Sequence, residues 1–280
     1  MANGNMRRTV GLAVAAMVAL GIPGCKRVSE TGPATAAAQP RSSGVPQAER
    51  TFTVVGEVHG TEQAPAEFLG LLLAALGDSA PVLVGVEIPP DALLDLRKAI
   101  KPGIDERSVI AALKDSGFWF NAKDGKTSEA NLRLLVELMK LESARKIVLV
   151  GFDIRSAGDT GPFGPSVVDA LVSSEAGSVI ARQERIQSAF LLTGRSHADF
   201  ESGDDSISEA LAQRGYRTTV VQLQPDGGTA WVCMMDRCGN HDLPASERCA
   251  NGQSKTVVLD GRRTLVSKCV GPATPSEPIF

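Results

Sequence analysis

The sequence predicts an α/β fold, in which a mixed, mainly parallel sheet is flanked by helices and followed by a disulfide-stapled, β-rich C-terminal region. Two observations carry this prediction. Short, almost continuously apolar runs alternate with segments of helical periodicity, as expected when helices cover both faces of a parallel sheet. From about residue 225 the helical segments stop, and short β-type runs, turns and four of the five cysteines follow.

Each element is predicted from its residue pattern. β-Branched runs closed by glycine, such as TFTVVG, indicate buried strands, and Pro89-Pro90 stops the second strand. A Thr-Ser pair in front of a periodic segment is typical of a helix N-terminus. The expected strands cover 51–56, 81–88, 146–154, 188–193 and 217–223. The expected helices cover 62–76, 91–100, 106–114, 127–143, 166–183 and 206–214, with an irregular aromatic patch at 118–120.

The first residues have the pattern of an export signal. Arg7 and Arg8 precede an apolar run too short to span a bilayer, and Ile22-Pro23-Gly24-Cys25 resembles a lipobox, with plain cleavage as the alternative. We therefore expect a lipoprotein signal peptide over 1–25 that ends at a lipidated Cys25. Lys26, rather than Asp, predicts the periplasmic face of the bacterial outer membrane. A simple periplasmic or secreted protein is the alternative.

Composition divides the rest of the chain. Residues 26–50 are rich in Ala, Pro, Gly, Ser and Gln and predict a flexible linker. Residues 51–280 form the expected α/β domain, of which 225–280 is a Cys-rich β extension.

The charge of the chain is nearly balanced. Lys plus Arg total 29 against 32 Asp plus Glu, and aromatic residues make up 4% of the chain. This balance excludes nucleic acid as an expected partner, because nothing neutralises a phosphate backbone or stacks on bases.

Four cysteines remain once Cys25 is assigned to the lipobox: Cys233, Cys238, Cys249 and Cys269. An even number in an exported chain predicts two disulfides, for which three pairings are possible. A zinc site that uses the first three of these cysteines together with His241 is the alternative, although the spacing matches no standard zinc module.

Polar residues follow four of the expected strands. They are Glu57 and His59 after the first, Glu87 in the second, Asp153 and Arg155 after the third, and Arg195 and His197 after the fourth. Ligands of open α/β sheets bind at the carboxyl ends of strands, so these side chains are expected to form one site.

Histidine is rare in the chain, which holds three, yet His59 and His197 share a Gly-x-x-His pattern at a strand end. Two neutral imidazoles and a carboxylate are a common divalent-metal ligand set, so His59, Glu87 and His197 are the expected metal ligands. Buried, hydrogen-bonded core histidines are the alternative.

Gly125-Lys126-Thr127 mimics the end of a phosphate-binding loop, but Phe120 stands where that motif needs glycine, so we assign the segment no function.

Three segments resemble a known superfamily. VVGEVHGTEQAPAEF, VGVEIP and LLTGRSHA are similar to the superfamily of Tiki proteases, TraB, erythromycin esterases and ChaN-type haem-uptake lipoproteins, over roughly residues 51–200. The resemblance implies an α/β fold with a site built from His59, Glu87 and His197 and supported by Glu57. Tiki-like members imply a divalent metal and hydrolysis, esterase-like members imply a water activated by His and Glu, and ChaN-like members imply haem binding.

The expected function is hydrolysis of ester or peptide-like bonds by an exported lipoprotein, with a divalent metal as suspected cofactor. The expected catalytic residues are Glu57, His59, Glu87, His197 and Arg195, with Glu57 as candidate general base. Asp153 and Arg155 are expected to bind the cofactor; Asp153 could also orient a site histidine, and Arg155 hold an anionic group. The alternative is a non-enzymatic haem-binding lipoprotein. Tyr216, the single tyrosine, lies outside the matched motifs.

Overall fold

The computed structural model describes residues 50–77, 80–101, 105–121, 124–154, 161–177, 186–234, 237–246, 249 and 254–280. Cys25, most of the expected linker and Arg155 lie outside these residues. The strands are β1 (Thr51–Glu57), β2 (Val82–Val86), β3 (Ile147–Gly151), β4 (Ser188–Gly194), β5 (Arg217–Gln224), β6 (Thr229–Met234), β7 (Arg237–Asp242), β8 (Lys255–Val258) and β9 (Arg263–Cys269). The helices are α1 (Gln63–Ala75), α2 (Pro90–Ala99), α3 (Glu106–Leu113), α4 (Gly117–Asn121), α5 (Glu129–Ser143), α6 (Phe163–Gly177), α8 (Arg195–Ala198), α9 (Ile207–Gln213) and the 3₁₀ turn η2 (Gly203–Asp205).

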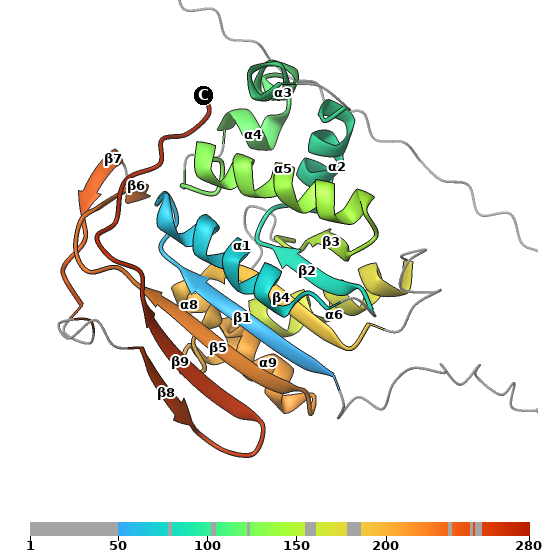
Figure 1. The fold of residues 1–280 in the computed structure, drawn as a ribbon, viewed down its shortest axis with the longest axis vertical. Coiled ribbons are helices and arrows are strands. Elements are labelled where there is room, and N and C mark those ends of the chain that lie inside the picture. The colour runs from blue at the N-terminus through green and yellow to red at the C-terminus, as the bar shows by residue number, and fades with distance from the viewer. Residues whose placement is uncertain are drawn as a thin grey trace, which may run out of the picture. The chain divides into compact units, whose positions relative to one another are not determined.

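A seven-stranded sheet in the order β3-β2-β4-β1-β5-β9-β8 forms the centre of the molecule (Figure 1). All its neighbouring pairs are parallel except β8 and β9, which are antiparallel. From β1 the chain moves outward to β2 and β3, returns to β4 beside β1, and then passes to β5 on the other side. The reversal falls between β1 and β4, where ligands bind in sheets of this kind.

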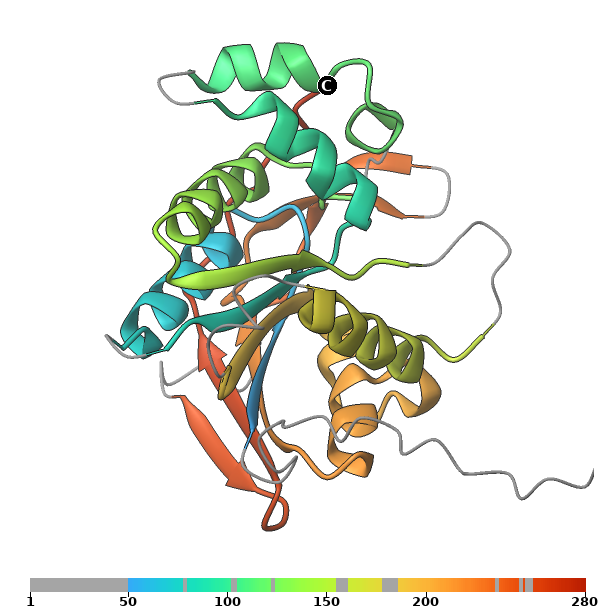
Figure 2. The ribbon, with the colours of Figure 1, turned by 90° about the vertical axis from the view of Figure 1, so that its right-hand side faces the viewer.

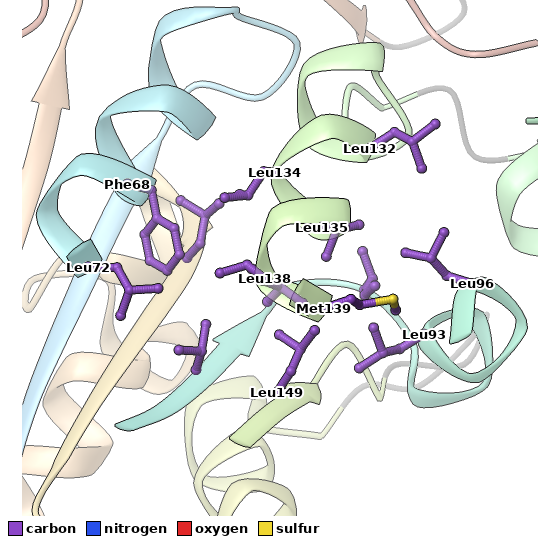
Figure 3. Close-up of a cluster of buried hydrophobic side chains, with 14 of the residues drawn as sticks. Phe68, Leu72, Leu93, Leu96, Leu132, Leu134, Leu135, Leu138, Met139 and Leu149 are labelled. Atoms are coloured by element: carbon purple, nitrogen blue, oxygen red, sulfur yellow. The ribbon is translucent and has the colours of Figure 1, made fainter. Parts of the chain in front are cut away.

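Helices cover both faces of the sheet, as the apolar strands require (Figure 2). One face packs against α1, α2 and α5, where Phe68, Leu96 and Leu138 are fully buried (Figure 3). The other packs against α6, α8 and α9, where Val167 and Leu211 are fully buried. The sequence prediction of a mainly parallel sheet flanked by helices is confirmed.

The C-terminal region is β-rich, as expected, and two disulfides staple it. Cys233 pairs with Cys238 across the β6–β7 hairpin, and Cys249 pairs with Cys269 at the end of β9. This pairing selects one of the three possibilities and rules out the cysteine zinc site. Two strands of this region, β8 and β9, extend the main sheet. One difference from the sequence prediction is the aromatic patch at 118–120, expected to be irregular, which lies within helix α4, where the Trp119 Nε1–H donates to Ala92 O at 3.0 Å.

The core cluster between α5 and the sheet generates a stability prediction. Leu138 is fully buried, so Leu138→Ala is expected to lower the free energy of unfolding by about 2–5 kcal/mol, through lost transfer energy and the cavity left behind. Leu73→Ala is the matched control, because Leu73 on α1 is 51% exposed, and it is expected to cost less than about 0.5 kcal/mol. Urea unfolding followed by circular dichroism measures both, and equal losses would contradict the packing described.

Candidate functional site at the carboxyl ends of the strands

The parallel register brings the strand ends together. Glu57, the last residue of β1, pairs with Gly194, the last residue of β4. Glu87 follows β2 directly, and its backbone N–H donates to Leu192 O at 3.2 Å. The ends of three neighbouring strands, β1, β4 and β2, therefore meet at one edge of the sheet, as the sequence predicts.

His59 is held by one glutamate and faces another. Its Nδ1 lies 2.8 Å from Glu57 Oε1, which fixes the orientation of the ring. Its Nε2 lies 4.0 Å from Glu87 Oε2, too far for a direct hydrogen bond. Both glutamates are buried, whereas the His59 side chain is 19% exposed. The second ring nitrogen thus faces a carboxylate across a gap.

Glu87 is fixed from three directions. Its Oε2 accepts hydrogen bonds from the Thr193 hydroxyl and from the Gly194 N–H at 2.8 Å, and its Oε1 lies 3.6 Å from Lys126 Nζ. Burial by itself would raise the pKa of Glu87. The charges of His59 and Lys126, followed by these hydrogen bonds, outweigh burial and lower the pKa below its usual range. Glu87 is consequently ionised at neutral pH.

Lys126 is a site residue that sequence reasoning missed. Its ammonium lies 2.8 Å from Asp153 Oδ2 and 3.1 Å from Asp124 Oδ2, in addition to its contact with Glu87. Burial would lower the pKa of Lys126, but the three carboxylates outweigh it and raise the pKa. The sequence shows no phosphate-binding loop here. The one local signal for Lys126 is its place two residues before Ser128, the N-cap of α5. Asp153, expected at a cofactor, instead binds this lysine.

The loop that carries Lys126 packs directly on the loop that carries His59. Gly125 has a φ of +87°, and a Cβ there would lie 2.6 Å from Gly60 N and 2.9 Å from His59 Cβ. Gly125 O accepts a hydrogen bond from Asn131 Nδ2 at 3.2 Å, which anchors the loop to α5. Only glycine lets the two loops approach this closely.

His197 lies beside this group without bonding to it. Its ring packs on Phe163 with centroids 4.4 Å apart, and its Nδ1 lies 3.3 Å from Asp205 O. A Cβ built on Gly194 would lie 3.2 Å from His59 Nε2 and 3.9 Å from His197 Cδ2, so Gly194 separates the two rings. His197 is therefore at the edge of the site, and the structure assigns it no bond to His59 or Glu87.

Arg195 belongs to a neighbouring polar cleft of about 450 Å³, whose lining includes Ser196, Asp199 and Gln222. The cavity at His59 is much smaller, about 20 Å³, and both glutamates and Lys126 line it. That volume accommodates about one water molecule.

Tyr216 lies away from the site. It is at the opposite end of the sheet, before β5, where its ring packs on Phe52 at a centroid distance of 4.8 Å.

The predicted metal ligands are not arranged as a coordination shell. His59 Nδ1 is engaged by Glu57, and the oxygens of Glu87 face two hydrogen-bond donors and an ammonium group. Within the described part of the chain, no group of three or more His, Cys, Asp or Glu side chains is placed to hold a metal ion. The three predicted ligands do not form a coordination set in this arrangement, so the metal role of His59, Glu87 and His197 stays a prediction.

The C-terminal segment, residues 270–280, ties the two site loops together (Figure 1). The N–H of Ser276 donates to Gly60 O at 2.8 Å, while its hydroxyl oxygen accepts from the Ala130 N–H at 2.9 Å. The N–H of Ile279 donates to Thr127 O at 3.1 Å. Because the Cys249–Cys269 disulfide holds the start of this segment, it positions the His59 loop relative to the Lys126 loop.

Comparisons with known proteins leave the family open. No family model matches the sequence, and no curated protein matches it. Among solved structures, the fold is similar to the type III effector HopBA1, with 14% identity, a TM-score of 0.41, and coverage of 80% of this chain and 88% of that chain. It is also similar to a Bacillus cereus protein, with 11% identity, a TM-score of 0.48, and coverage of 82% and 90%.

The first prediction from the site concerns the ionisation of His59. Burial alone would lower its pKa from 6.5, but the hydrogen bond and charge of Glu57, and then the charge of Glu87, raise it to about 9. A raised pKa contributes stability that is complete below about pH 6.5 and is lost as the pH rises through about 9, of the order of 3 kcal/mol. Ring titration by NMR in the presence of a chelator checks the pKa, and a value near 6.5 would contradict the Glu57 contact.

The second prediction concerns the C-terminal segment. Ser276→Ala removes the acceptor of the Ala130 N–H at a buried position, so the free energy of unfolding is expected to fall by about 1–3 kcal/mol. The His59 ring resonances are expected to shift, because the two site loops lose a shared anchor. Ser166→Ala is the control, since Ser166 on α6 is not buried and its hydroxyl donates to Pro162 O, four residues earlier in the chain. Unchanged stability in Ser276→Ala would show that this segment does not hold the site.

Proposed function

We propose that this chain is a hydrolase of ester or peptide-like bonds that works through Glu57, His59 and Glu87. The observation that supports the proposal most strongly is the cavity of about 20 Å³ that these three side chains share, where His59 Nε2 and Glu87 Oε2 lie 4.0 Å apart. An oriented imidazole opposite an ionised carboxylate, with room for one water, is an arrangement suited to acid–base catalysis.

In the proposed reaction, water occupies the gap and attacks a carbonyl carbon. Glu87 accepts the proton that the water loses. The Nε2–H of the protonated His59 passes to the leaving oxygen or nitrogen as its bond to the carbonyl carbon breaks. Transfer of the proton from Glu87 to His59 then restores both groups, and the net reaction is hydrolysis. Glu57 keeps the ring oriented through Nδ1, so we place it as a positioning residue rather than as the general base.

The remaining charged residues have supporting roles in this proposal. Lys126 compensates the charge of Glu87 and fixes its direction, at an Nζ–Oε1 distance of 3.6 Å. Arg195 lines the neighbouring polar cleft, where it can bind a polar or anionic part of the substrate. His197 lies on the other side of Gly194, and we assign it no step of the reaction.

We also propose that the protein is a lipoprotein anchored at Cys25 on the periplasmic face of the outer membrane. Its two disulfides indicate a non-cytoplasmic, oxidising compartment. No helix in the described part of the chain is long and apolar enough to cross a membrane. The lipobox-like sequence before Cys25 supports the anchor.

The test of the hydrolase uses p-nitrophenyl butyrate and a fluorogenic peptide mixture as probes. His59→Gln and Glu87→Gln are each expected to lower kcat/KM by about 10²–10⁴-fold, because each removes one partner of the acid–base pair. His241→Gln is the matched control, since the half-buried His241 lies on β7, outside the candidate site, and it is expected to leave the activity unchanged. Wild-type turnover of neither probe, or full activity in His59→Gln, would overturn the proposal.

Two further readouts of the same preparations separate the alternatives. Activity that survives dialysis against a chelator supports the metal-free reaction. Activity that is lost and then restored by a divalent ion would support the metal-dependent form that the sequence predicts. A Soret band after addition of haem, absent in a His59→Gln/His197→Gln variant, together with no hydrolysis, would instead identify a haem-binding lipoprotein.

A further inference from the structure

The amino-terminal ends of the strands, opposite the candidate site, carry two arginines side by side. Arg217 begins β5 and Arg262 immediately precedes β9, and the Thr218 N–H donates to Arg262 O at 2.8 Å. Both side chains are exposed, and neither has an ion-pair partner within the part of the chain that the structure describes. Arg263 differs, because Asp260 and Glu209 compensate its charge. Arg217 and Arg262 thus place two positive charges at this edge that form no ion pair with the described residues.

Two exposed apolar side chains lie at the start of the turn that contains Arg262. Val258 is the last residue of β8 and is 69% exposed, and Leu259, in the turn to β9, is 46% exposed. The β8–β9 turn is the outermost part of the sheet at this end (Figures 1 and 2). Apolar side chains in a protruding turn, flanked by basic ones, suit the interface of a membrane with anionic lipids.

The chain enters the fold at the same edge. Thr51, the first residue of β1, pairs with Arg217 in the parallel register. If the 24 residues between Cys25 and Arg50 form the flexible linker that the sequence predicts, their root-mean-square span would be about 25–30 Å. A lipid on Cys25 would therefore keep this edge near the bilayer at a high effective concentration, where a weak contact suffices to orient the domain.

We propose that this edge rests on an anionic phospholipid surface, with Val258 and Leu259 in the interface and Arg217 and Arg262 against headgroup phosphates. The candidate site, at the far end of the seven-residue strand β1, then lies roughly 20 Å farther from the lipid and faces away from it. The contact depends on the edge alone and holds whether or not the site is hydrolytic.

The experiment measures co-sedimentation of the chain from residue 26 onward, with no lipid anchor, with vesicles. Ser43–Phe280 form one compact unit that contains the whole described fold, so this chain keeps its sheet. Binding is expected to vesicles of phosphatidylcholine mixed with phosphatidylglycerol, to weaken with added salt, and to be far weaker to phosphatidylcholine alone. Arg217→Gln/Arg262→Gln is expected to lower the affinity about thirtyfold, since each basic residue near an anionic surface contributes about 1 kcal/mol.

Matched controls keep the proposal falsifiable. Val258→Ser/Leu259→Ser is expected to lower the affinity at least about tenfold. Leu73→Ser/Leu94→Ser, which alters two similarly exposed leucines on α1 and α2, is expected to leave it unchanged. Arg107→Gln/Lys114→Gln, at α3, is the charge control. Equal losses in test and control variants, or no preference for anionic vesicles, would overturn the proposal, and circular dichroism confirms that each variant is folded.

Discussion

The buried carboxylate of Glu87 is the group on which the site depends. An ionised carboxylate in the interior is costly unless it is paired and hydrogen-bonded. Here the Thr193 hydroxyl and Gly194 N–H bind one oxygen, Lys126 lies near the other, and His59 faces the group across the gap. These partners come from the end of β4 and from two separate loops, so satisfying this one charge fixes the relative positions of β2, β4 and the two loops.

The topology explains why the partners meet at this place. The reversal of strand order lies between β1 and β4, and the last residues of these strands, Glu57 and Gly194, are paired in register. Gly194 has no side chain to fill the space beside His59 Nε2 and Glu87 Oε2, so these two groups face each other across a gap. The core layers and the disulfide-anchored C-terminal segment hold this edge in a fixed geometry, which acid–base catalysis requires.

The fold was largely predictable from the sequence, because strand and helix periods are local signals. TFTVVG and KIVLVGFDI read as buried strands, and the structure places β1 and β3 there. The meeting of Glu57, His59 and Glu87 followed from the rule that parallel strands end at one edge. Lys126 was not predictable in the same way, because Glu87 and Asp153, the partners that place it in the site, are remote in sequence. The separation of His197 from Glu87 depends on its contact with Phe163, which no local pattern reveals.

A double-mutant cycle on Glu87 and Lys126 tests the central claim most directly. The free energies of unfolding of Glu87→Gln, Lys126→Met and the double variant are compared with that of the wild type. If the buried carboxylate depends on the lysine charge, the double variant loses less stability than the sum of the single variants, by at least about 1 kcal/mol. Losses that add within about 0.5 kcal/mol would show that the two charges do not interact and would contradict the account.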